Sequence, residues 1–507
     1  MLSTKSENSS LIIVNPVTGD ESLPVFQYSS IIENTQITGI LRMKSQTDVR
    51  LELIDLSRRW AEGKSFDAAK ARDLRRQALI LNHGHYAKNI PVYRKVVYEA
   101  GNIDVTDSNS IKKHFMLSSD IFKSYDPAWL DRLDFNRMTN WLSGLCDRPI
   151  TAAMDGVTSI DTWIDRLDAQ NIKVVYSSGT SGVFSFVPKS AADRTSSTIA
   201  NIAFLVPMLA ERMGGNVISK HIVKNAVQSL SIESLPRLVK KGLPGFDAAF
   251  LAFRQGKMGN QVLIQELAPF FENSYFLFDL EITGTALRCI RRGPGNETEQ
   301  RLLEAFQKEV VDNRDLNYLR LIKAVEQSTL ERRKIFMFGA PFQFKELCEY
   351  MAVRQRKVPL RKGSLIFFGG GWKSFAGDSL DSDSLVKAIA ENFAISPDSI
   401  LEGYSMSEIN TLMIRCKKRR FHVPPTIEPA VFDDALNPVE GNDITGSFGF
   451  LDPFASSYPG FIITNDYVRL VAEGCECGLP GPGILSIQRL PGSEIKGCGG
   501  IMSSFTA

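Results

Sequence analysis

Small hydroxylated residues and glycines gather in one segment of the chain, and their chemistry suits the binding of phosphate. The segment contains, in order, Ser177, Ser178, Gly179, Thr180, Ser181 and Gly182. An apolar run over residues 172–175 precedes it and predicts a strand. Backbone N–H groups and hydroxyl donors in such a loop can surround a triphosphate, because glycine lets the backbone curl around the anion. The sequence therefore predicts a phosphate-binding loop, although an ordinary surface turn can have the same composition.

Five further motifs follow this loop along the chain. They are Phe338-Gly339-Ala340-Pro341, Phe368-Gly369-Gly370-Gly371-Trp372-Lys373, Gly403-Tyr404-Ser405-Met406-Ser407-Glu408, Thr464-Asn465-Asp466, and Gln488-Arg489 leading to Ile495-Lys496. The six motifs in this order resemble the adenylate-forming superfamily of acyl-CoA synthetases, luciferases and peptide-synthetase adenylation domains. The resemblance covers residues 170–500, about two thirds of the chain.

Within that superfamily the sequence is similar to two branches. One branch is the acyl-protein synthetases, the fatty-acid ligase component of the bacterial luminescence reductase complex. The features shared with it are the loop at 177–182, Ser185, Asp193, the Gly-Gly-Trp-Lys at 370–373 and the segment 494–498. Phenylacetate-CoA ligase-like enzymes are the next most similar branch. Members of both activate a carboxylate with ATP, so the resemblance implies ATP, Mg²⁺ and a carboxylic acid substrate.

The resemblance also implies a nucleotide-binding role for each matched residue. The loop hydroxyls would hold the β and γ phosphates, and their dipoles would offset the charge on the leaving pyrophosphate. Glu408 would bind Mg²⁺ and take part in catalysis. Tyr404 would stack on adenine, and Ser405 and Ser407 belong to the same cofactor-binding motif.

Residues from three other motifs complete this nucleotide site. Asp466 would accept hydrogen bonds from the ribose hydroxyls, and Arg489 would contact the ribose or a phosphate. The glycines Gly369–Gly371 would let the backbone approach the adenine and the acyl group closely. Each side chain also has an ordinary alternative: Glu408 as a solvated acid at a helix start, Asp466 as a turn residue, and Arg489 as a surface cation.

Three lysines are candidates for stabilising the phosphoryl charge that develops in the reaction: Lys189, Lys373 and Lys496. In most of the superfamily Pro-Lys-Gly follows the phosphate loop closely, whereas here Pro188-Lys189 begins six residues after Gly182. Most members also continue into a mobile lid with an essential lysine, and this chain ends eleven residues after Lys496. We therefore expect the C-terminal lid to be truncated or absent, as in acyl-protein synthetases, with Lys189 and Lys373 as candidate catalytic cations.

A cysteine near the end of the chain is a candidate acyl acceptor. Cys498 lies between glycines and two residues after Lys496. Such a thiol is accessible and can have a lowered pKa, which favours thiolate attack. In acyl-protein synthetases a cysteine near this position takes the acyl group from the adenylate as a thioester. The alternative is a cysteine of the tail without a role.

Three further cysteines and a histidine form a candidate metal site. One residue separates Cys475 from Cys477, and five residues separate Cys416 from His422. Three thiols and one imidazole are enough for a closed tetrahedral zinc site. Neither spacing is that of a standard zinc finger, but phenylacetate-type ligases carry a similar Cys-x-Cys-Gly after the ribose-binding aspartate. The sequence therefore indicates a candidate structural Zn²⁺ site, with free thiols and a surface imidazole as the alternative.

The elements that must position these residues change in character along the chain. Beyond residue 170, apolar strands alternate with glycine-rich turns and amphipathic helices, which is typical of an α/β sheet. The predicted strands include 172–176, 334–338, 364–368 and 461–464. We expect an α/β fold, the large N-terminal domain of the adenylate-forming fold with helices packed on β-sheets. The expected divisions are a loosely ordered lead over 1–45, a helical region over 46–150, the core over 151–497 and a tail over 498–507.

Composition excludes several other classes of function. The chain has 507 residues, of which 43% are hydrophobic and 23% charged, close to globular averages. Lysine and arginine (59) exceed aspartate and glutamate (57) by two, so no large uniform field attracts nucleic acid. Seven cysteines are too few for a disulfide scaffold and predict a cytoplasmic setting. The longest apolar stretch, Ile199–Ala210, is shorter than the about 20 residues of a membrane span, so we expect none.

The leading interpretation is an ATP-dependent, AMP-forming ligase. It would convert a carboxylic acid to an acyl-adenylate, release pyrophosphate and pass the acyl group to a thiol or amine, which includes transfer through a Cys498 thioester to a partner protein. The alternative is a biosynthetic amide, ester or CoA-thioester synthetase that acts on an aromatic or fatty acid without an enzyme-bound thioester. A non-catalytic nucleotide-binding scaffold is a more remote alternative. The sequence leaves the oligomeric state open.

Overall fold

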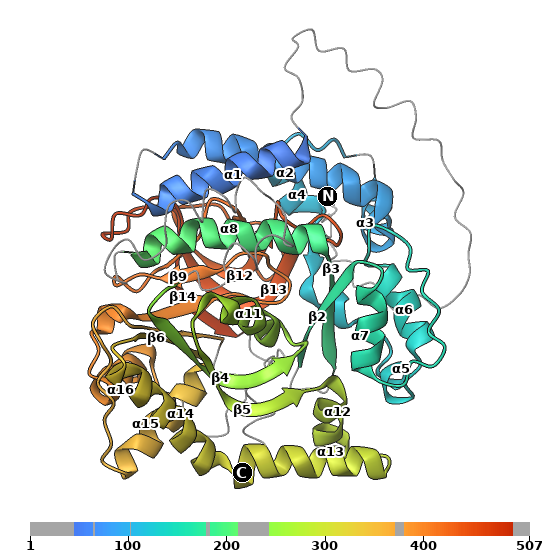
Figure 1. Ribbon diagram of the computed structural model, residues 1–507. Coiled ribbons are helices and arrows are strands. Elements are labelled where there is room, and N and C mark those ends of the chain that lie inside the picture. Colours follow the sequence, from blue (N-terminus) through green and yellow to red (C-terminus); the bar gives the residue numbers. More distant parts are fainter. Residues whose placement is uncertain are drawn as a thin grey trace, which may run out of the picture.

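The computed structural model describes residues 45–63, 66–101, 103–178, 183–210, 243–370 and 380–489. Over these ranges helices pack on β-sheets, so the fold class is α/β, as the sequence predicts (Figure 1). The predicted tail at 498–507 and the predicted lead, apart from Ser45, lie outside the described residues. Among the helices in these ranges, none is long and apolar enough to cross a membrane.

The first part of the described chain is mainly helical. Its elements are α1 (Gln46–Ala61), α2 (Ala68–Asn89), α3 (Pro91–Ala100), α4 (Ser108–His114), β1 (Leu117–Ser118), the 3₁₀ helix η2 (Ser119–Lys123), α5 (Pro127–Asp131), α6 (Phe135–Ser143) and α7 (Ile160–Asp168). Side-chain caps fix several helix starts: Ser45 accepts a hydrogen bond from the Asp48 N–H, and Asp67 accepts one from the Lys70 N–H.

One large sheet runs through the rest of the chain. Its order is β11-β12-β13-β14-β10-β9-β8-β7-β6-β4-β5, and β1 pairs with β13. The strands are β4 (Phe246–Gly256), β5 (Ser274–Ile282), β6 (Lys334–Gly339), β7 (Leu365–Gly369), β8 (Ile400–Tyr404), β9 (Met413–Arg415), β10 (Phe421–His422), β11 (Glu428–Phe432), β12 (Asp443–Leu451), β13 (Phe461–Val471) and β14 (Gly483–Arg489). Pairing is parallel from β5 to β8 and antiparallel from β8 to β11.

Helices connect the parallel strands, because a parallel crossover needs a long connection. They are α11 (Gly259–Leu267), η3 (Ala268–Phe270), α12 (Gly284–Arg292), α13 (Glu297–Gln307), the π-helical turn η4 (Lys308–Asp312), α14 (Arg314–Leu330), α15 (Pro341–Val353), α16 (Ser382–Phe393) and η5 (Pro397–Ser399). In Figure 1, α14, α15 and α16 lie together beside β6. The strands predicted at 334–338, 364–368 and 461–464 correspond to β6, β7 and the start of β13.

The segment predicted as a strand and phosphate loop belongs to a separate hairpin. Strands β2 (Ile172–Ser178) and β3 (Phe184–Ser190) form an antiparallel two-stranded sheet. The strand therefore runs farther than the predicted 172–176 and includes Ser177 and Ser178, which the sequence had placed in the loop. Helix α8 (Ala191–Ala210) follows β3 directly.

Three long helices form a layer over the antiparallel half of the sheet. Figure 1 shows α1 and α2 side by side, with α8 between them and strands β12–β14. The buried residues that join α1, α2 and α8 to the turn after β12 include Leu53, Ile54, Ala78, Ile199 and Phe454. The N-terminal helices therefore share a core with the sheet.

Two buried carboxylates hold this helical layer in place. Glu428 of β11 forms ion pairs with Arg75 of α2 at 3.2 Å and Lys112 of α4 at 2.6 Å. Although burial opposes ionisation, these two cations hold the pKa of Glu428 at about 2. Asp193 of α8 is fully buried and accepts hydrogen bonds from the backbone N–H groups of Ser456 and Ser457.

Candidate functional site

The carboxyl ends of β6, β7 and β8 lie together where the sheet changes from parallel to antiparallel pairing. Gly369, the last residue of β7, pairs with Gly403 of β8. A Cβ atom on Gly403 would lie 2.4 Å from the ring of Phe367, so only glycine fits there. Gly370 follows with a φ of +83°, which glycine adopts without strain. In open α/β sheets, ligands bind at the carboxyl ends of strands beside such a change of topology.

The hydroxyl-bearing hairpin meets the predicted catalytic acid at this edge. Ser177 of β2 pairs with Ser185 of β3, and Ser185 Oγ lies 3.4 Å from Glu408 Oε1. The Glu408 side chain is buried, at 4% exposure. Ser407, next to Glu408, lies close to the start of α11, because a Cβ on Gly259 would be 3.4 Å from its hydroxyl. The structure thus brings Ser177 and the 405–408 motif to the same place.

Tyr404, Asp466 and Arg489 form a connected set on three strands. The Tyr404 hydroxyl donates to Asp466 Oδ2 at 2.8 Å, and Arg489 Nη1 lies 3.1 Å from Asp466 Oδ1. Asp466 and Arg489 are paired across β13 and β14. Burial, together with the charge of Asp466, raises the pKa of the Tyr404 hydroxyl well above its usual range, so it stays a donor.

Lys189 is buried next to the segment that carries Glu408. Its Nζ donates to Asn410 Oδ1 at 2.9 Å and to the Ile409 carbonyl at 3.4 Å, and lies 5.8 Å from the Tyr458 ring centre. Burial lowers the pKa of Lys189 to about 8, while the nearby charge of Asp452 acts in the opposite direction. In this structure the Lys189 ammonium therefore fixes the backbone that follows Glu408.

Sequence reasoning missed the residues that surround Lys189. Asp452 accepts hydrogen bonds from the backbone N–H groups of Asn410 and Phe454 at 2.8 Å each. The Asn410 amide donates to the Tyr458 hydroxyl at 2.8 Å. The sequence did contain a signal, because Asp452-Pro453 directly follows the apolar strand β12. No motif, however, linked this pair to the 409–410 segment.

The remaining predicted residues are Ser405, Ser178 and those that lie outside the described residues. Ser405 lies just after β8, and its hydroxyl donates to the Thr411 carbonyl at 3.0 Å. Ser178 ends β2, and its side chain is not among those described. The predictions that lie outside the described residues are those for Gly179, Thr180, Ser181, Gly182, Gly371, Lys373, Lys496 and Cys498.

The predicted zinc ligands come together away from this edge, around β9, β10 and the loop between β13 and β14. The ligand atoms of Cys416, His422, Cys475 and Cys477 all lie within 4.8 Å of one another. Two of these contacts are 3.7 Å between the sulfurs of Cys416 and Cys475 and 3.1 Å between Cys477 Sγ and His422 Nε2. Burial lowers the pKa of His422 to about 4, which keeps its imidazole neutral.

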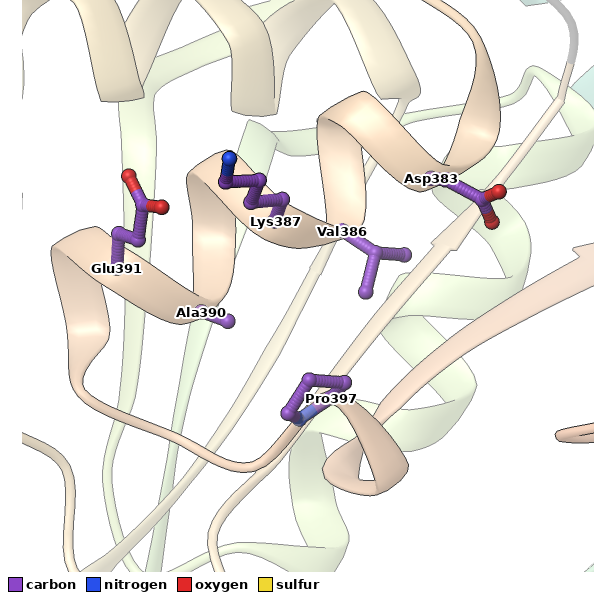
Figure 2. A pocket seen from close by; sticks show the side chains of 6 residues that line it. All are labelled: Asp383, Val386, Lys387, Ala390, Glu391 and Pro397. Carbon is purple, nitrogen blue, oxygen red and sulfur yellow. The ribbon is translucent and has the colours of Figure 1, made fainter.

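A shallow pocket on the outer face of α16 is a different feature (Figure 2). Its volume is about 390 Å³, and it is lined by Asp383, Val386, Lys387, Ala390, Glu391 and Pro397. Asp383 forms an ion pair with Arg419. The lining includes none of the residues predicted to act on substrate, so this pocket is not the candidate site.

Comparison with models of protein families gives a match in the C-terminal part of the chain. Residues 305–506 match the family model described as "Acyl-protein synthetase, LuxE". This range contains the predicted residues from Gly369 to Cys498, whereas the hairpin β2–β3 and Lys189 lie before it.

Two curated relatives are both long-chain-fatty-acid–luciferin-component ligases. The protein from Aliivibrio fischeri is 29% identical over 193 residues, which are 37% of this chain and 50% of the relative. The protein from Vibrio harveyi is 30% identical over 178 residues, which are 34% of this chain and 46% of the relative. The chain thus spans about half the length of the curated relatives it matches.

One solved structure with a similar backbone arrangement is an open conformation of 2-hydroxyisobutyryl-CoA ligase in complex with 2-HIB-AMP and CoA. It superposes with a TM-score of 0.48 at 12% identity, over 85% of this chain and 77% of that one.

The lowered pKa of Lys189 predicts a pH dependence of stability. The pKa of Lys189 is about 8 in the folded protein and about 10.5 when the chain is unfolded, so between these pH values the folded state binds fewer protons. The contribution of this group to the free energy of unfolding therefore increases as the pH rises from about 8 to 10.5. A Lys189→Met variant should lack this increase, which amounts to about 2–4 kcal/mol. Denaturant unfolding of both proteins at pH 7.5, 9 and 10.5 measures it. Parallel curves for the two proteins would contradict the lowered pKa.

Proposed function

We propose that this protein uses ATP to convert a carboxylic acid to an acyl-adenylate and then transfers the acyl group to a thiol. The observation that carries the proposal is the meeting of three groups at the carboxyl edge of β7 and β8: the Ser177/Ser185 hairpin, Glu408, and the Tyr404–Asp466–Arg489 set. The match of residues 305–506 to the acyl-protein synthetase model supports it, as do the two similar ligases. On this proposal the fold is that of the adenylate-forming enzymes.

The polar groups at the edge suit the parts of ATP. Serine hydroxyls on a hairpin offer hydrogen-bond donors to phosphate oxygens. Asp466 offers a carboxylate to the two hydroxyls of the ribose, and Arg489, already paired with it, adds a positive charge. We propose that adenine binds beside Tyr404, where Gly369 and Gly403 bring the backbones of β7 and β8 close together.

Glu408 fits the binding of Mg²⁺. Its carboxylate is buried, and the Ser185 hydroxyl lies beside it, so oxygen atoms of the kind that Mg²⁺ prefers are already in place. When bound with ATP, Mg²⁺ would neutralise charge on the phosphates. Lys189 holds the backbone after Glu408 through Ile409 and Asn410, and we propose that it positions this carboxylate.

The proposed reaction has two steps. A carboxylate oxygen of the acid attacks the α-phosphorus of ATP, and the bond from that phosphorus to the oxygen of the β-phosphate breaks, which releases pyrophosphate. A thiolate then attacks the acyl carbon, and AMP leaves with the electron pair of the broken carbon–oxygen bond. AMP is a far better leaving group than oxide, so a modest nucleophile is sufficient in the second step.

The acceptor in the second step is proposed to be Cys498, followed by a partner protein. The acyl-protein synthetase match reaches residue 506 and so includes this cysteine. A fatty acid is the proposed substrate class, because both similar ligases act on long-chain fatty acids by name. We place the reaction in the cytoplasm, where thiols stay reduced.

We propose a structural zinc ion at Cys416, His422, Cys475 and Cys477. Two thiolates on one tetrahedral zinc ion, at about 2.3 Å from the metal, lie roughly 3.8 Å apart. The Cys416–Cys475 separation of 3.7 Å fits this value, and the neutral His422 supplies the fourth ligand. Bound zinc would tie the β13–β14 loop to β9 and β10, and thereby support the two strands that carry Asp466 and Arg489.

Removal of the Glu408 carboxylate tests the adenylation step. Glu408→Ala should reduce fatty-acid-dependent exchange of radiolabelled pyrophosphate into ATP by about 100-fold or more, because the metal-bound phosphates lose their protein ligand. Glu440→Ala, which removes an exposed carboxylate from a distant loop, should leave the exchange unchanged. Full exchange by the Glu408 variant would rule out the role given to this residue.

Intact-mass measurement tests the acceptor. Wild-type protein incubated with ATP and tetradecanoic acid should gain one acyl group that hydroxylamine removes. Cys498→Ser should adenylate the acid normally but carry no such adduct, because an alcohol is a much weaker nucleophile than a thiolate. Normal acyl transfer by this variant would favour direct transfer to an external thiol or amine.

Elemental analysis tests the zinc site. Purified protein should contain about one zinc ion per chain, and Cys477→Ser should contain less than a tenth of that amount, with a lower thermal midpoint. The matched control is Cys289→Ala, which removes a buried cysteine outside the cluster and should retain zinc. Stoichiometric zinc in the Cys477 variant, or none in the wild type, would refute the site.

A further inference from the structure

A second pocket lies at the opposite edge of the parallel sheet, where the strands begin. It has a volume of about 380 Å³ and is lined by Pro244, Gly245, Arg332, Lys334, Arg361 and Lys362. Four of these six residues are cations and none is an acid. Three segments that are distant in the sequence supply them: the start of β4, the entry to β6 and the turn before β7. Like charges repel one another, so an anion that binds among these cations would relieve the repulsion between them.

The carboxylates of the neighbouring segments are already used by another residue. Arg333 forms ion pairs with Asp247, Glu272 and Glu331. Glu272 also accepts a hydrogen bond from the Gly245 N–H at 2.9 Å. Within the described ranges, Arg332, Arg361 and Lys362 form no ion pair with a carboxylate. Their positive charge is therefore available to a ligand.

The backbone holds these cations at the rim of the pocket. Ser364 N–H donates to the Arg361 carbonyl at 2.9 Å and closes a turn, with Gly363 at a φ of +89°. Arg332 lies at the end of α14 with a φ of +63°, a conformation in which glycine is normally favoured. This conformation ends α14 and fixes the direction in which the chain enters β6.

We propose that this pocket binds a small anion that carries two or more phosphate groups. Guanidinium groups match phosphate oxygens in pairs, and lysine adds a compact positive charge. The volume is in the range of small-molecule sites rather than that of a single ion. The ligand is not the nucleotide of the proposed reaction. Strand β6 begins at this pocket with Lys334 and ends at the edge of the candidate site with Gly339, so about 17 Å of strand separates the two sites.

Calorimetric titration with inorganic tripolyphosphate at low ionic strength tests the proposal. The wild type should bind, with an affinity that falls as salt is added, because the cations are exposed. Arg361→Ala/Lys362→Ala should bind at least about tenfold more weakly, since two of the three cations that form no ion pair within the described part of the chain are lost. Arg132→Ala/Lys323→Ala removes two exposed cations elsewhere and should bind like the wild type. Thermal melts establish that each variant is folded.

Two further measurements separate this site from others. The Ser185→Ala/Glu408→Ala variant changes the candidate nucleotide site and leaves the basic pocket intact. It should bind tripolyphosphate as the wild type does, whereas Arg361→Ala/Lys362→Ala should not. This result is expected even if the protein does not adenylate an acid. Vesicles that contain phosphatidic acid, tested with the same variants, distinguish a lipid headgroup from a soluble phosphate compound. Equal tripolyphosphate affinity in the wild type and the Arg361/Lys362 variant, or no binding by the wild type, would overturn the proposal.

Discussion

The central constraint in this structure is the change of strand direction at β8. This strand pairs in parallel with β7 and antiparallel with β9, so the chain must turn back immediately after Tyr404. The turning segment carries Ser405, Ser407 and Glu408. It follows the last residue of β8, so the sheet places it at the carboxyl edge. Glycine at 369 and 403 allows β7 and β8 to end close together. The position of the candidate site follows from this arrangement.

Buried charges hold the turning segment and the hairpin in register with the rest of the molecule. The Lys189 ammonium of β3 donates a hydrogen bond to the Ile409 carbonyl of this segment. The Asp452 carboxylate accepts a hydrogen bond from the backbone N–H of Asn410 in the same segment. Asp193 and Glu428 hold the helical layer to the same half of the sheet. Ionised groups are costly to bury unless hydrogen-bonded, and each of these is. The result is a buried, hydrogen-bonded frame beneath the candidate site.

The chemistry of the molecule is distributed over separate parts of one sheet. The carboxyl edge carries hydroxyl, carboxylate and phenol groups that suit a nucleotide. The Cys416–His422–Cys475–Cys477 cluster lies where β9 and β10 meet the loop before β14. The basic pocket lies at the amino edge of the same parallel strands.

The sequence by itself determined the α/β class, the starts of β6 and β13, the start of β7 to within one residue, and the residue types of the site. It could do so because hydrophobic periodicity and glycine positions are local properties. It also selected the four metal-ligand candidates by type. Tertiary structure decided which residues meet. Tyr404 and Asp466 are 62 positions apart, and Lys189 and Asn410 are 221 apart. Such contacts depend on the register of several paired strands and on burial, neither of which leaves a local pattern in the chain.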